Sequence, residues 1–393
     1  MERFSQSATD PAFVQDPYPF YDRLRAAGDI VFWEDYGMPM ATTHAAVSAL
    51  MKDRRLGRAR SDFTWDIDDE VLGAFNALEA HSLLELEPPD HTRLRALVNR
   101  AFTSRSVQSM APAISAIADT LLVDLPAQPF DLLDAYCRPL PVLVIARMLG
   151  VPSEMAPDLL KWSNAMVAMY QARTSPEIDA AAGQAAADFT AYLEQFIEGR
   201  RKAPGSDLMT ALIAAEEDGT RLSTPELIAT CILLLNAGHE ATVHTLGNGV
   251  KAILESNMAR DMLLPEQVNQ TVEEVLRFDP PLHMFTRHVY EEVEFFGHTF
   301  KPGDEVGCLL ASANRDDAAW PAAHRFDPSR AIKTNLSFGA GIHFCVGAPL
   351  ARLEMQIALP LLFSGCPELQ LVEPPKYADI YHFHGLQALS VSV

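Results

Sequence analysis

The longest uninterrupted apolar helical pattern in the chain runs from Ser223 to about Ser256. Ser223 and Glu226 have the spacing of a capping box, and Pro225 suits the first turn of a helix. No further proline interrupts the pattern before Pro265. At about 1.5 Å per residue, such a helix is roughly 50 Å long, which exceeds the usual globular helix. A helix of that length is expected to cross the core of the molecule.

Helical patterns dominate the first 280 residues, and the pattern changes to short strands after them. No long linker is visible, so residues 1–393 are interpreted as a single domain. The remaining expected elements are a helix that contains Ala180–Ala187, a helix from near Pro265 to Phe278, short strands within Val289–Val306, a helix from Gly347 to about Phe363, and a final strand at Leu386–Val393.

Composition excludes several classes of protein. The chain has 393 residues, of which 48% are hydrophobic and 21% charged, as in ordinary soluble globular proteins. The 31 Lys and Arg residues against 52 Asp and Glu residues give a net charge of −21. Because nucleic acids and anionic membranes are bound by clustered Lys and Arg, this balance disfavours both as partners.

Cysteine usage and the N-terminus indicate the cytoplasm. The five cysteines are an odd number and form no C-x-x-C pair, which disfavours a disulfide framework or a zinc ribbon. The first residues lack a basic start followed by an apolar stretch, so no signal peptide is visible. The longest strongly apolar stretch, about Leu227–Ala237, is too short to span a bilayer. A soluble cytoplasmic protein is expected.

The segment Phe338–Gly347, FGAGIHFCVG, carries the chemistry. Its glycines allow a tight turn and a close approach of the backbone to a flat group. Cys345 follows at the start of a helix, where unpaired N–H groups and the helix dipole favour a thiolate. A single thiolate with glycine and aromatic neighbours suits one axial bond to a heme iron. The alternative for a bare cysteine after glycine is a buried structural thiol.

This segment resembles the heme-binding signature of the cytochrome P-450 family, F-x-x-G-x-H-x-C-x-G, and matches every motif position. Glu274-Val-Leu-Arg277 resembles the family's E-x-x-R motif, and Trp320–Arg330 resembles its meander. The resemblance spans at least residues 11–393. It implies the cytochrome P-450 fold, mainly α with small β-sheet regions and a long central helix over the heme. It also implies that Arg330 joins Glu274 and Arg277 in a structural ion-pair cluster.

By the same resemblance, the cofactor is heme b (iron protoporphyrin IX) and Cys345 is the metal ligand. Guanidinium and imidazolium groups suit the heme propionates because they form charge-assisted hydrogen bonds with carboxylates. The residues that resemble the family's heme contacts are His91, Arg95, Arg287, His343, Phe338, Gly339 and Gly347.

The long helix contains a departure from the family pattern A/G-G-x-D/E-T-T. The matching residues, expected to be catalytic, are Gly238, His239, Glu240, Ala241 and Thr242. By resemblance, the small pair at the start lets oxygen and substrate approach the iron, and Glu240 is the acid of a proton-delivering acid–alcohol pair. The alcohol position is Ala241, and Thr242 is turned away by about 100°. An ordered water, a polar group of the substrate or His239 could replace the missing hydroxyl.

Two histidine pairs offer alternatives that the spacing disfavours. His239 and His244 are five residues apart, whereas a zinc protease helix needs its two histidines at i and i+4. His382 and His384 could ligate a metal from one face of a strand, but a terminal turn is the simpler interpretation.

A local excess of arginine lies between His91 and Ser106, where no acidic residue occurs. It predicts a docking surface for an acidic [2Fe-2S] or similar ferredoxin, which with its NAD(P)H-dependent reductase supplies electrons. A solvated helix face is the alternative. The predicted docking residues are Arg93, Arg100, Arg105 and Arg352.

The substrate pocket implied by the resemblance is mostly apolar, as ligand pockets usually are. Its expected residues are Leu234, Ala237, Leu282, His283, Met284, Phe285 and Phe383, with a contribution from the loop around Phe63–Leu86. The expected activity is insertion of one oxygen atom from O2 into a small or medium apolar molecule, by hydroxylation or O-demethylation. A peroxide-using enzyme, an oxidative-coupling enzyme and a non-catalytic heme sensor are the alternatives.

Overall fold

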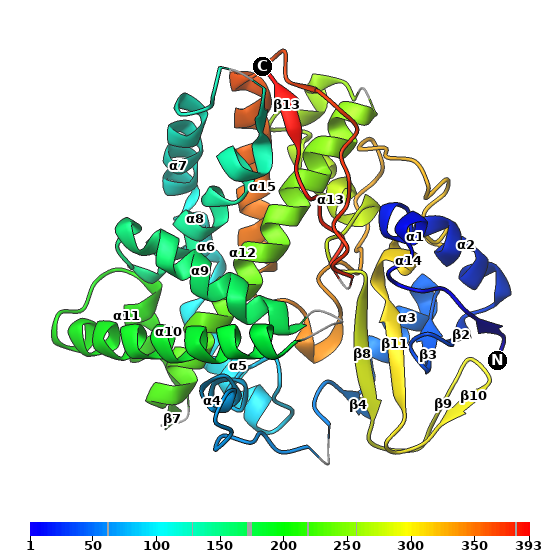
Figure 1. Ribbon diagram of the computed structural model, residues 1–393, viewed down its shortest axis with the longest axis horizontal. Helices are drawn as coiled ribbons and strands as arrows, with labels where there is room; N and C mark the ends of the chain where they lie inside the picture. Colours follow the sequence, from blue (N-terminus) through cyan, green and yellow to red (C-terminus); the bar gives the residue numbers. More distant parts are fainter. Residues whose placement is uncertain (61–62, 128, 171–174, 218–219, 257, 382) are drawn as a thin grey trace.

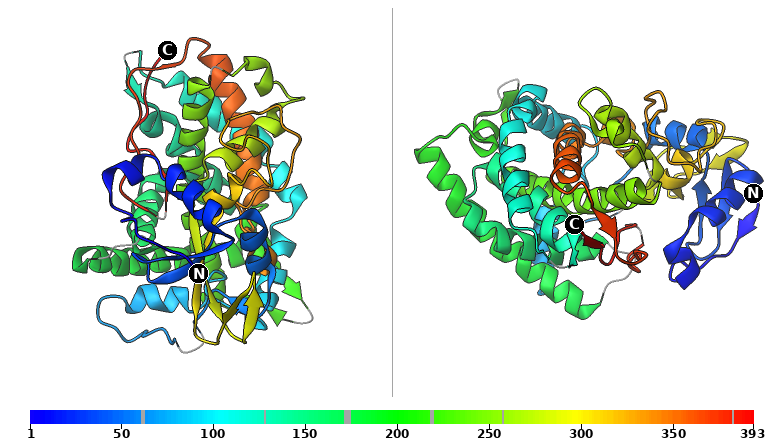
Figure 2. Two further views of the ribbon diagram at one scale, coloured as in Figure 1. Left: turned by 90° about the vertical axis from the view of Figure 1, so that its right-hand side faces the viewer. Right: turned by 90° about the horizontal axis from the view of Figure 1, so that it is seen from above.

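The computed structural model describes residues 1–60, 63–127, 129–170, 175–217, 220–256, 258–381 and 383–393. Figure 1 shows a larger helical part around α12 (Thr224–Glu255) and a smaller part with the N-terminal helices and the longer strands. The view from above in Figure 2 places the N-terminal segment at one end and α10 (Pro176–Lys202) at the other. This arrangement confirms the predicted mainly α fold with small sheets.

The central helix α12 forms where the sequence predicts it. The Ser223 hydroxyl accepts a hydrogen bond from the Glu226 N–H, and the Glu226 carboxylate accepts one from the Ser223 N–H, so both caps of the box are present. Most of the residues of α12 are buried, because other helices pack on several of its sides. The helix therefore gains most of its stability from tertiary packing rather than from intrinsic propensity.

The other helices cover α12 or the sheet. Those of the helical part include α8, α9 and α10 on one side of α12 and α13 and α15 on another. Their bounds are α1 (Pro11–Gln15), α2 (Tyr18–Ala27), α3 (His44–Lys52), α4 (Gly73–Glu79), α5 (Asp90–Ala101), α6 (Ser104–Gln108), α7 (Ala111–Val123), α8 (Pro139–Leu149), α9 (Ala156–Val167), α11 (Leu208–Ala214), α13 (Val268–Phe278), α14 (Leu310–Asn314) and α15 (Ala348–Gly365).

A six-stranded sheet has the order β1-β2-β3-β11-β8-β4. The pairs β1–β2 and β3–β11 are parallel and the other three pairs antiparallel, with Val306 of β11 opposite Arg287 of β8. The strands of this sheet are β1 (Arg3–Phe4), β2 (Ile30–Trp33), β3 (Met38–Ala41), β4 (Leu56–Gly57), β8 (Met284–Val289) and β11 (Glu305–Leu309).

Three smaller sheets complete the described strands. They join β5 (Phe130–Asp131), β12 (Gln370–Leu371) and β13 (Ser390–Ser392); β6 (Glu216–Glu217) and β7 (Thr220–Arg221); and β9 (Val293–Phe295) and β10 (His298–Phe300).

The hairpin β2–β3 lies within the first 280 residues, where helical patterns dominate, and was not predicted from the sequence. Ile30–Trp33 is a run of β-branched and aromatic residues, and the turn that follows contains Gly37 at φ +64°. Trp33 packs in an aromatic core with Phe13, Phe20 and Tyr381. The helical periodicity around this short hairpin obscured the strand signal.

One stretch in the described part of the chain, Ser104–Val123, is long and apolar enough to cross a membrane by length and composition alone. In the structure it is divided between α6 and α7, and α7 packs against α15 and α8. It is weak evidence for a membrane span, because helices of soluble proteins pass the same test.

Candidate active site

The Cys345 loop is shaped by two glycines in left-handed conformation. Gly339 has φ +70° and Gly341 has φ +76°, values that L side chains rarely adopt. A Cβ at Gly341 would also overlap the carbonyl oxygen of Met51 in α3. The loop closes where the N–H of Cys345 donates to the carbonyl of Phe338 at 3.0 Å. The backbone therefore fixes the thiol just before α15, whose N-cap is Gly347.

The thiol is not activated by its protein surroundings alone. Burial raises the pKa of Cys345, although the N–H groups of Gly347 and Ala348 and the guanidinium groups of Arg95 and Arg352 act in the opposite direction. The expectation that the helix start would make this cysteine a thiolate is therefore wrong for the protein groups by themselves. The charge of a coordinated metal ion would deprotonate the thiol.

Buried donors with few acceptors surround the loop. The rings of His91 and His343 lie 4.3 Å apart, and Nε2 of His91 has no hydrogen-bond partner among the described residues. Arg287 is 2% exposed and, within the described chain, its guanidinium donates to the Thr286 carbonyl. Arg95 donates to the Phe344 carbonyl at 2.7 Å. Such donors suit a bound anion, so the residues present fit a heme with propionate carboxylates.

Burial lowers the pKa of three of these donors. The pKa of His91 falls to about 4, with the neighbouring His343 as the next cause, and the pKa values of Arg287 and His343 are also lowered. Glu87, which the sequence analysis missed, lies 3.0 Å from Nε2 of His343. Its position before Pro88 carries no recognisable sequence signal, so only the fold reveals this pair.

The predicted structural cluster comes together beside the loop. Arg277 forms two hydrogen bonds with Glu274, both at 2.7 Å, and donates to three carbonyl groups. Nε of Arg330 lies 3.4 Å from Oε1 of Glu274. The Asp327 N–H also donates to Glu274, which ties the meander to α13. Because the carboxylate and the guanidinium are saturated with partners, the cluster can hold the chain that leads to Cys345.

A stripe of accessible residues interrupts the buried surface of α12. Ala237 is exposed, and Leu234, Gly238 and Ala241 are partly exposed, although they lie in the middle of a buried helix. Their spacing places them on one face. Leu282 and Phe383, which pair in an isolated β-bridge, and Phe285 are also partly exposed. The accessible stripe and these residues are consistent with the predicted apolar pocket.

Within the Ala237–Gly238 pair, Gly238 also has a packing role. A Cβ at this position would lie 2.6 Å from Cδ1 of Ile145 in α8. The small residue therefore lets α8 pack closely against α12, and the exposed member of the pair is Ala237.

His283 and Met284 face away from the predicted pocket, which corrects that expectation. His283 is 0% exposed, and its Nδ1 lies 3.0 Å from the hydroxyl of Tyr21 in α2. Met284 belongs to the aromatic core formed with the N-terminal helices. The strand β8 begins at Met284 and extends the sheet toward that core. Sequence spacing alone could not show which face of the segment meets the N-terminus.

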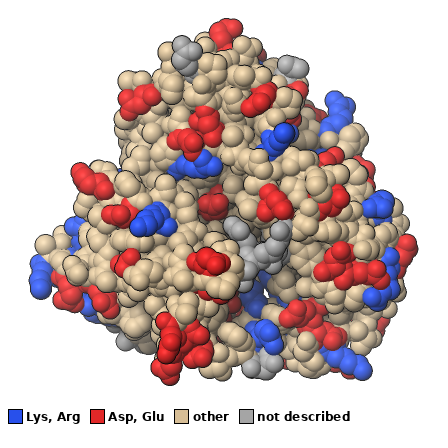
Figure 3. All heavy atoms as spheres, in the orientation of Figure 1, with Lys and Arg blue, Asp and Glu red and all other residues tan. Residues whose placement is uncertain are grey.

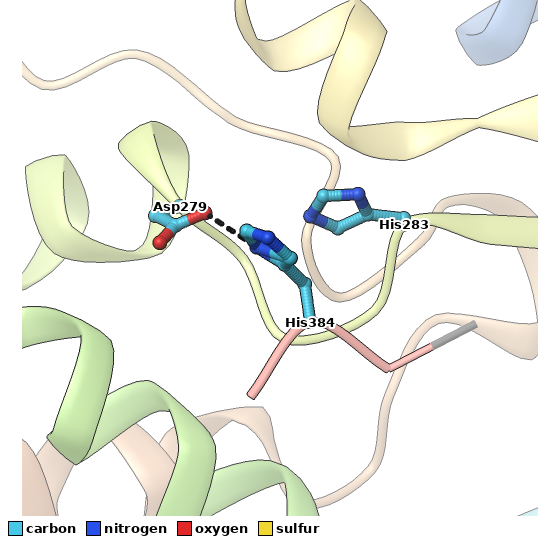
Figure 4. A group of neighbouring side chains, drawn as sticks. All are labelled: Asp279, His283 and His384. Atoms are coloured by element: carbon cyan, nitrogen blue, oxygen red, sulfur yellow. Dashed lines mark hydrogen bonds and ion pairs between the residues drawn. The ribbon is translucent and has the colours of Figure 1, made fainter. Parts of the chain in front are cut away.

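His384 lies in a buried cluster with Asp279 and His283, in which Asp279 and His384 are hydrogen-bonded (Figure 4). Their ligand atoms lie within 4.8 Å of one another. However, the carboxylate of Asp279 already accepts hydrogen bonds from Tyr18, Tyr377 and His384, at 2.6, 2.5 and 3.1 Å. These bonds account for the cluster without a metal ion. His382, the other member of the histidine pair noted in the sequence, lies outside the described residues.

Glu240 lies between two histidines of its own helix. Its Oε1 is 3.0 Å from Nε2 of His244, and its Oε2 is 3.7 Å from Nδ1 of His239. Burial acts to raise the pKa of Glu240, but the hydrogen bond from His244 and the charges of His244, His239 and Arg138 outweigh it, so the pKa is lowered. Burial lowers the pKa of His239 to about 4.

Two buried titratable residues of the helical part, His244 and Glu354, were not predicted as site residues from the sequence. His244 was considered only in a protease pattern, although its i, i+4 spacing to Glu240 is a signal for a pair on one helix face. Glu354 of α15 is 1% exposed, its Oε2 has no partner among the described residues, and burial raises its pKa well above the usual value. A carboxylate between Leu353 and Met355 in a buried helix was the available signal.

The predicted docking arginines lie in different surroundings. Arg93 forms an ion pair with Glu226 at the start of α12, and Arg352 forms one with Glu273 of α13. Arg100 and Arg105 are exposed. On the face shown in Figure 3, Asp and Glu side chains are scattered among uncharged residues, with fewer Lys and Arg. The ion pair with Glu226 neutralises the charge of Arg93, which is part of the positive charge expected around α5.

Comparison with known proteins gives consistent results. The cytochrome P-450 family model matches residues 255–370. A vitamin D(3) 25-hydroxylase from Pseudonocardia autotrophica is 39% identical over 366 residues, which cover 91% of this chain and 88% of that protein. The cytochrome P-450 monooxygenase PikC from Streptomyces venezuelae is 36% identical over 395 residues, which cover 96% of this chain and 91% of that protein.

Solved structures also match over nearly the whole length. The crystal structure of P-450 BioI in complex with an acyl carrier protein ligated to hexadec-9Z-enoic acid has a TM-score of 0.91 and 31% identity. The match covers 98% of this chain and 100% of that chain. The bacillaene polyketide synthase cytochrome P-450 PksS of Bacillus subtilis has a TM-score of 0.87 and 32% identity, over 98% and 99% of the two chains.

Proposed function

The chain belongs to the cytochrome P-450 family of heme b monooxygenases, and from that premise we propose that it hydroxylates an apolar organic molecule of small or medium size with O2. The observation that carries this proposal is the Cys345 loop, a partly exposed thiol held by two left-handed glycines and close to cationic and imidazole donors, of which Nε2 of His91 has no partner among the described residues. We also propose that residues 1–393 form a single heme domain and act in the cytoplasm.

The site residues have three proposed roles: holding the iron, binding the propionates and moving a proton. When bound, heme with a thiolate ligand supplies oxygen activation, because the thiolate pushes electron density toward the iron. Cys345 would hold the iron, and His91, Arg95, Arg287 and His343 would bind the propionates. Glu240 would take up a proton from water and pass it toward the pocket, since an oriented carboxylate can act as a general acid and base.

The substrate is proposed from the character of the pocket. Leu234, Leu282, Phe285 and Phe383 offer an apolar and aromatic lining and exclude water from the reacting carbon. The name of the 39% identical relative states 25-hydroxylation of vitamin D(3). Hydroxylation at carbon is therefore the first candidate, and O-demethylation by the same oxygen insertion is the second. We further propose that an acidic ferredoxin supplies electrons at Arg100 and Arg105.

A peroxide-using or coupling enzyme is the second candidate function, because Ala241 lacks the hydroxyl that supports proton delivery from O2. A non-catalytic heme sensor is disfavoured by the retained Glu240. Turnover with peroxide alone, compared with turnover with ferredoxin, its reductase and O2, would separate these functions.

The deciding experiment is the absorption spectrum of the purified protein, reduced and then exposed to carbon monoxide. We expect the strongly red-shifted Soret band of thiolate-ligated heme, and we expect Cys345→Ser to lose that band. Cys308→Ser, which changes another buried thiol, is the matched control and should keep it. A band at the position of histidine-ligated heme, or no heme band in folded protein, would overturn the proposal. A positive result permits a substrate screen by the change in spin state on binding.

A further inference from the structure

We propose that His244 is a positioning residue for proton delivery, which holds the Glu240 carboxylate in place where the family's alcohol is replaced by Ala241. This inference rests on the proposed monooxygenase function and on the proposed role of Glu240. It assigns the support of that carboxylate to a residue one helical turn away rather than to the adjacent position.

The turn of α12 around Ala241 offers no substitute hydroxyl. Thr245 Oγ1 donates to the Ala241 carbonyl at 2.7 Å, so this hydroxyl is used within the helix. Thr242 is 4% exposed, and its position is rotated by about 100° from that of Ala241. The carboxylate of Glu240 therefore needs an orienting partner other than a neighbouring alcohol.

His244 provides that partner with defined hydrogen positions. A carboxylate only accepts hydrogen bonds, so the 3.0 Å contact with Glu240 assigns a hydrogen to Nε2 of His244. In a neutral imidazole, Nδ1 is then without hydrogen, which is consistent with Nδ1 having no partner among the described residues. The pair is therefore a charge-assisted hydrogen bond on one face of α12.

The imidazole of His244 is held from the opposite side by the C-terminal segment. Its ring lies 5.9 Å from that of Phe383, and a Cβ at Gly385 would overlap the imidazole. This segment is fixed to α12 because Nδ2 of Asn248 donates to the His384 carbonyl at 2.8 Å and to the Asp279 carbonyl at 3.2 Å. The geometry of the pair thus depends on two segments far apart in sequence.

The surroundings of Glu240 keep its carboxylate ionised and so able to accept a proton. The hydrogen bond from His244 acts on it together with the imidazole of His239 and the guanidinium of Arg138 at the start of α8, and His384 of the C-terminal segment interacts electrostatically with His244. Their combined effect lowers the pKa of Glu240 despite burial. An ionised and oriented carboxylate can take a proton from water and release it toward the pocket.

The test compares His244→Leu, His244→Gln and Glu240→Gln in the heme-loaded enzyme. The Gln side chain at 244 can still donate to Glu240, whereas Leu cannot. We expect His244→Leu to increase peroxide release per NADPH about tenfold, the size of effect expected for loss of a hydrogen bond to a charged group. We expect His244→Gln to restore most of the coupling, because the proposed role is orientation.

A second measurement does not depend on turnover. Infrared difference titration of the Glu240 carboxyl, assigned by its loss in Glu240→Gln, should show its pKa raised by about one unit or more in His244→Leu and little changed in His244→Gln. Wild-type coupling and an unchanged carboxyl titration in folded His244→Leu, while Glu240→Gln uncouples the enzyme, would overturn the inference. If Glu240→Gln is silent as well, the proposed role of Glu240 fails together with this inference, and the heme-thiolate assignment still stands on its spectrum.

Discussion

The support of the Cys345 loop and the middle of α12 treat their buried polar groups in opposite ways. Around the loop, Glu274 and Arg277 are saturated by each other and by backbone groups. In the middle of α12, Asn236 Oδ1 and both ring nitrogens of His239 are buried and have no hydrogen-bond partner among the described residues. A buried polar group usually has a partner, so an unpartnered one indicates a place for a ligand or water.

The difference separates a structural cluster, Glu274 and Arg277, from the turn of α12 around Ala241, for which we propose a role in the reaction. The Cys345 segment matches the family's heme-binding motif at every position, and the hydrogen bonds of its support leave no polar side-chain atom of Glu274 or Arg277 without a partner. The turn of α12 departs from the pattern at Ala241 and has the His239–Glu240–His244 arrangement instead. Substitutions in the first region should therefore affect folding and heme retention, and those in the second should affect the fate of reduced oxygen.

Arg277→Ala should give the largest effect in this comparison. It leaves Glu274 as a buried charge without its main partner, which costs about 3–5 kcal/mol of unfolding free energy. Chemical denaturation and the heme content of the purified protein measure this loss. Arg330→Ala is the control, because that side chain is 15% exposed and lies farther from Glu274, and it should cost only about 1–2 kcal/mol. Equal losses of unfolding free energy in the two variants would show that Arg277 is no more important to this cluster than Arg330.

Ala241→Thr directly tests the turn of α12 around Glu240. It restores a hydroxyl at the alcohol position without removing Glu240 or His244, and we expect a several-fold change in peroxide release per NADPH with an unchanged carbon monoxide spectrum. General acid–base contributions of about 100-fold or more allow such a change. Thr242→Val, which removes a hydroxyl from the adjacent position, should alter coupling much less. Identical peroxide release in Ala241→Thr and wild type would contradict a role for this position.

Charge reversal at Arg100 and Arg105 should give the smallest effect, confined to electron supply. These exposed charges lie on α5 and α6, and their reversal should slow reduction by an acidic ferredoxin about tenfold or less at low salt. Lys161→Glu with Lys202→Glu makes the same change in net charge on α9 and α10 and should have little effect. Stopped-flow measurement of the reduction rate, at low salt and at about 0.5 M salt, where screening is strong, compares the two variants. Normal rates for the arginine variant at low salt would exclude this docking surface.

Linear spacing was enough to predict the parts that depend on local geometry. The capped helix of α12, the glycine turn before Cys345 and the Glu274–Arg277 pair each follow from residues close together in the sequence. The helix predicted from near Pro265 begins at Val268, and the predicted final strand shortens to Ser390–Ser392. Element ends depend on capping and on strand partners, which periodicity does not show.

Contacts between distant segments were beyond such reasoning. His283 was predicted to lie in the pocket because its partner, Tyr21, is far away in the sequence and approaches it only in the fold. Arg93 and Arg352 appeared to be free charges because Glu226 and Glu273 approach them only in the fold. His244 is different, since its i, i+4 relation to Glu240 was visible and only the comparison with a protease pattern concealed it.

Gly385 also constrains how this protein can change over generations. While residue 244 is histidine, any side chain at 385 would collide with the imidazole, so the two positions are epistatic. A lineage that gains a side chain at 385 must first have lost the bulk at 244, and a lineage that acquires His244 must already carry glycine at 385. The order of these substitutions is therefore dictated by sterics, and homologues that carry histidine at the first position with alanine or a larger residue at the second should be rare.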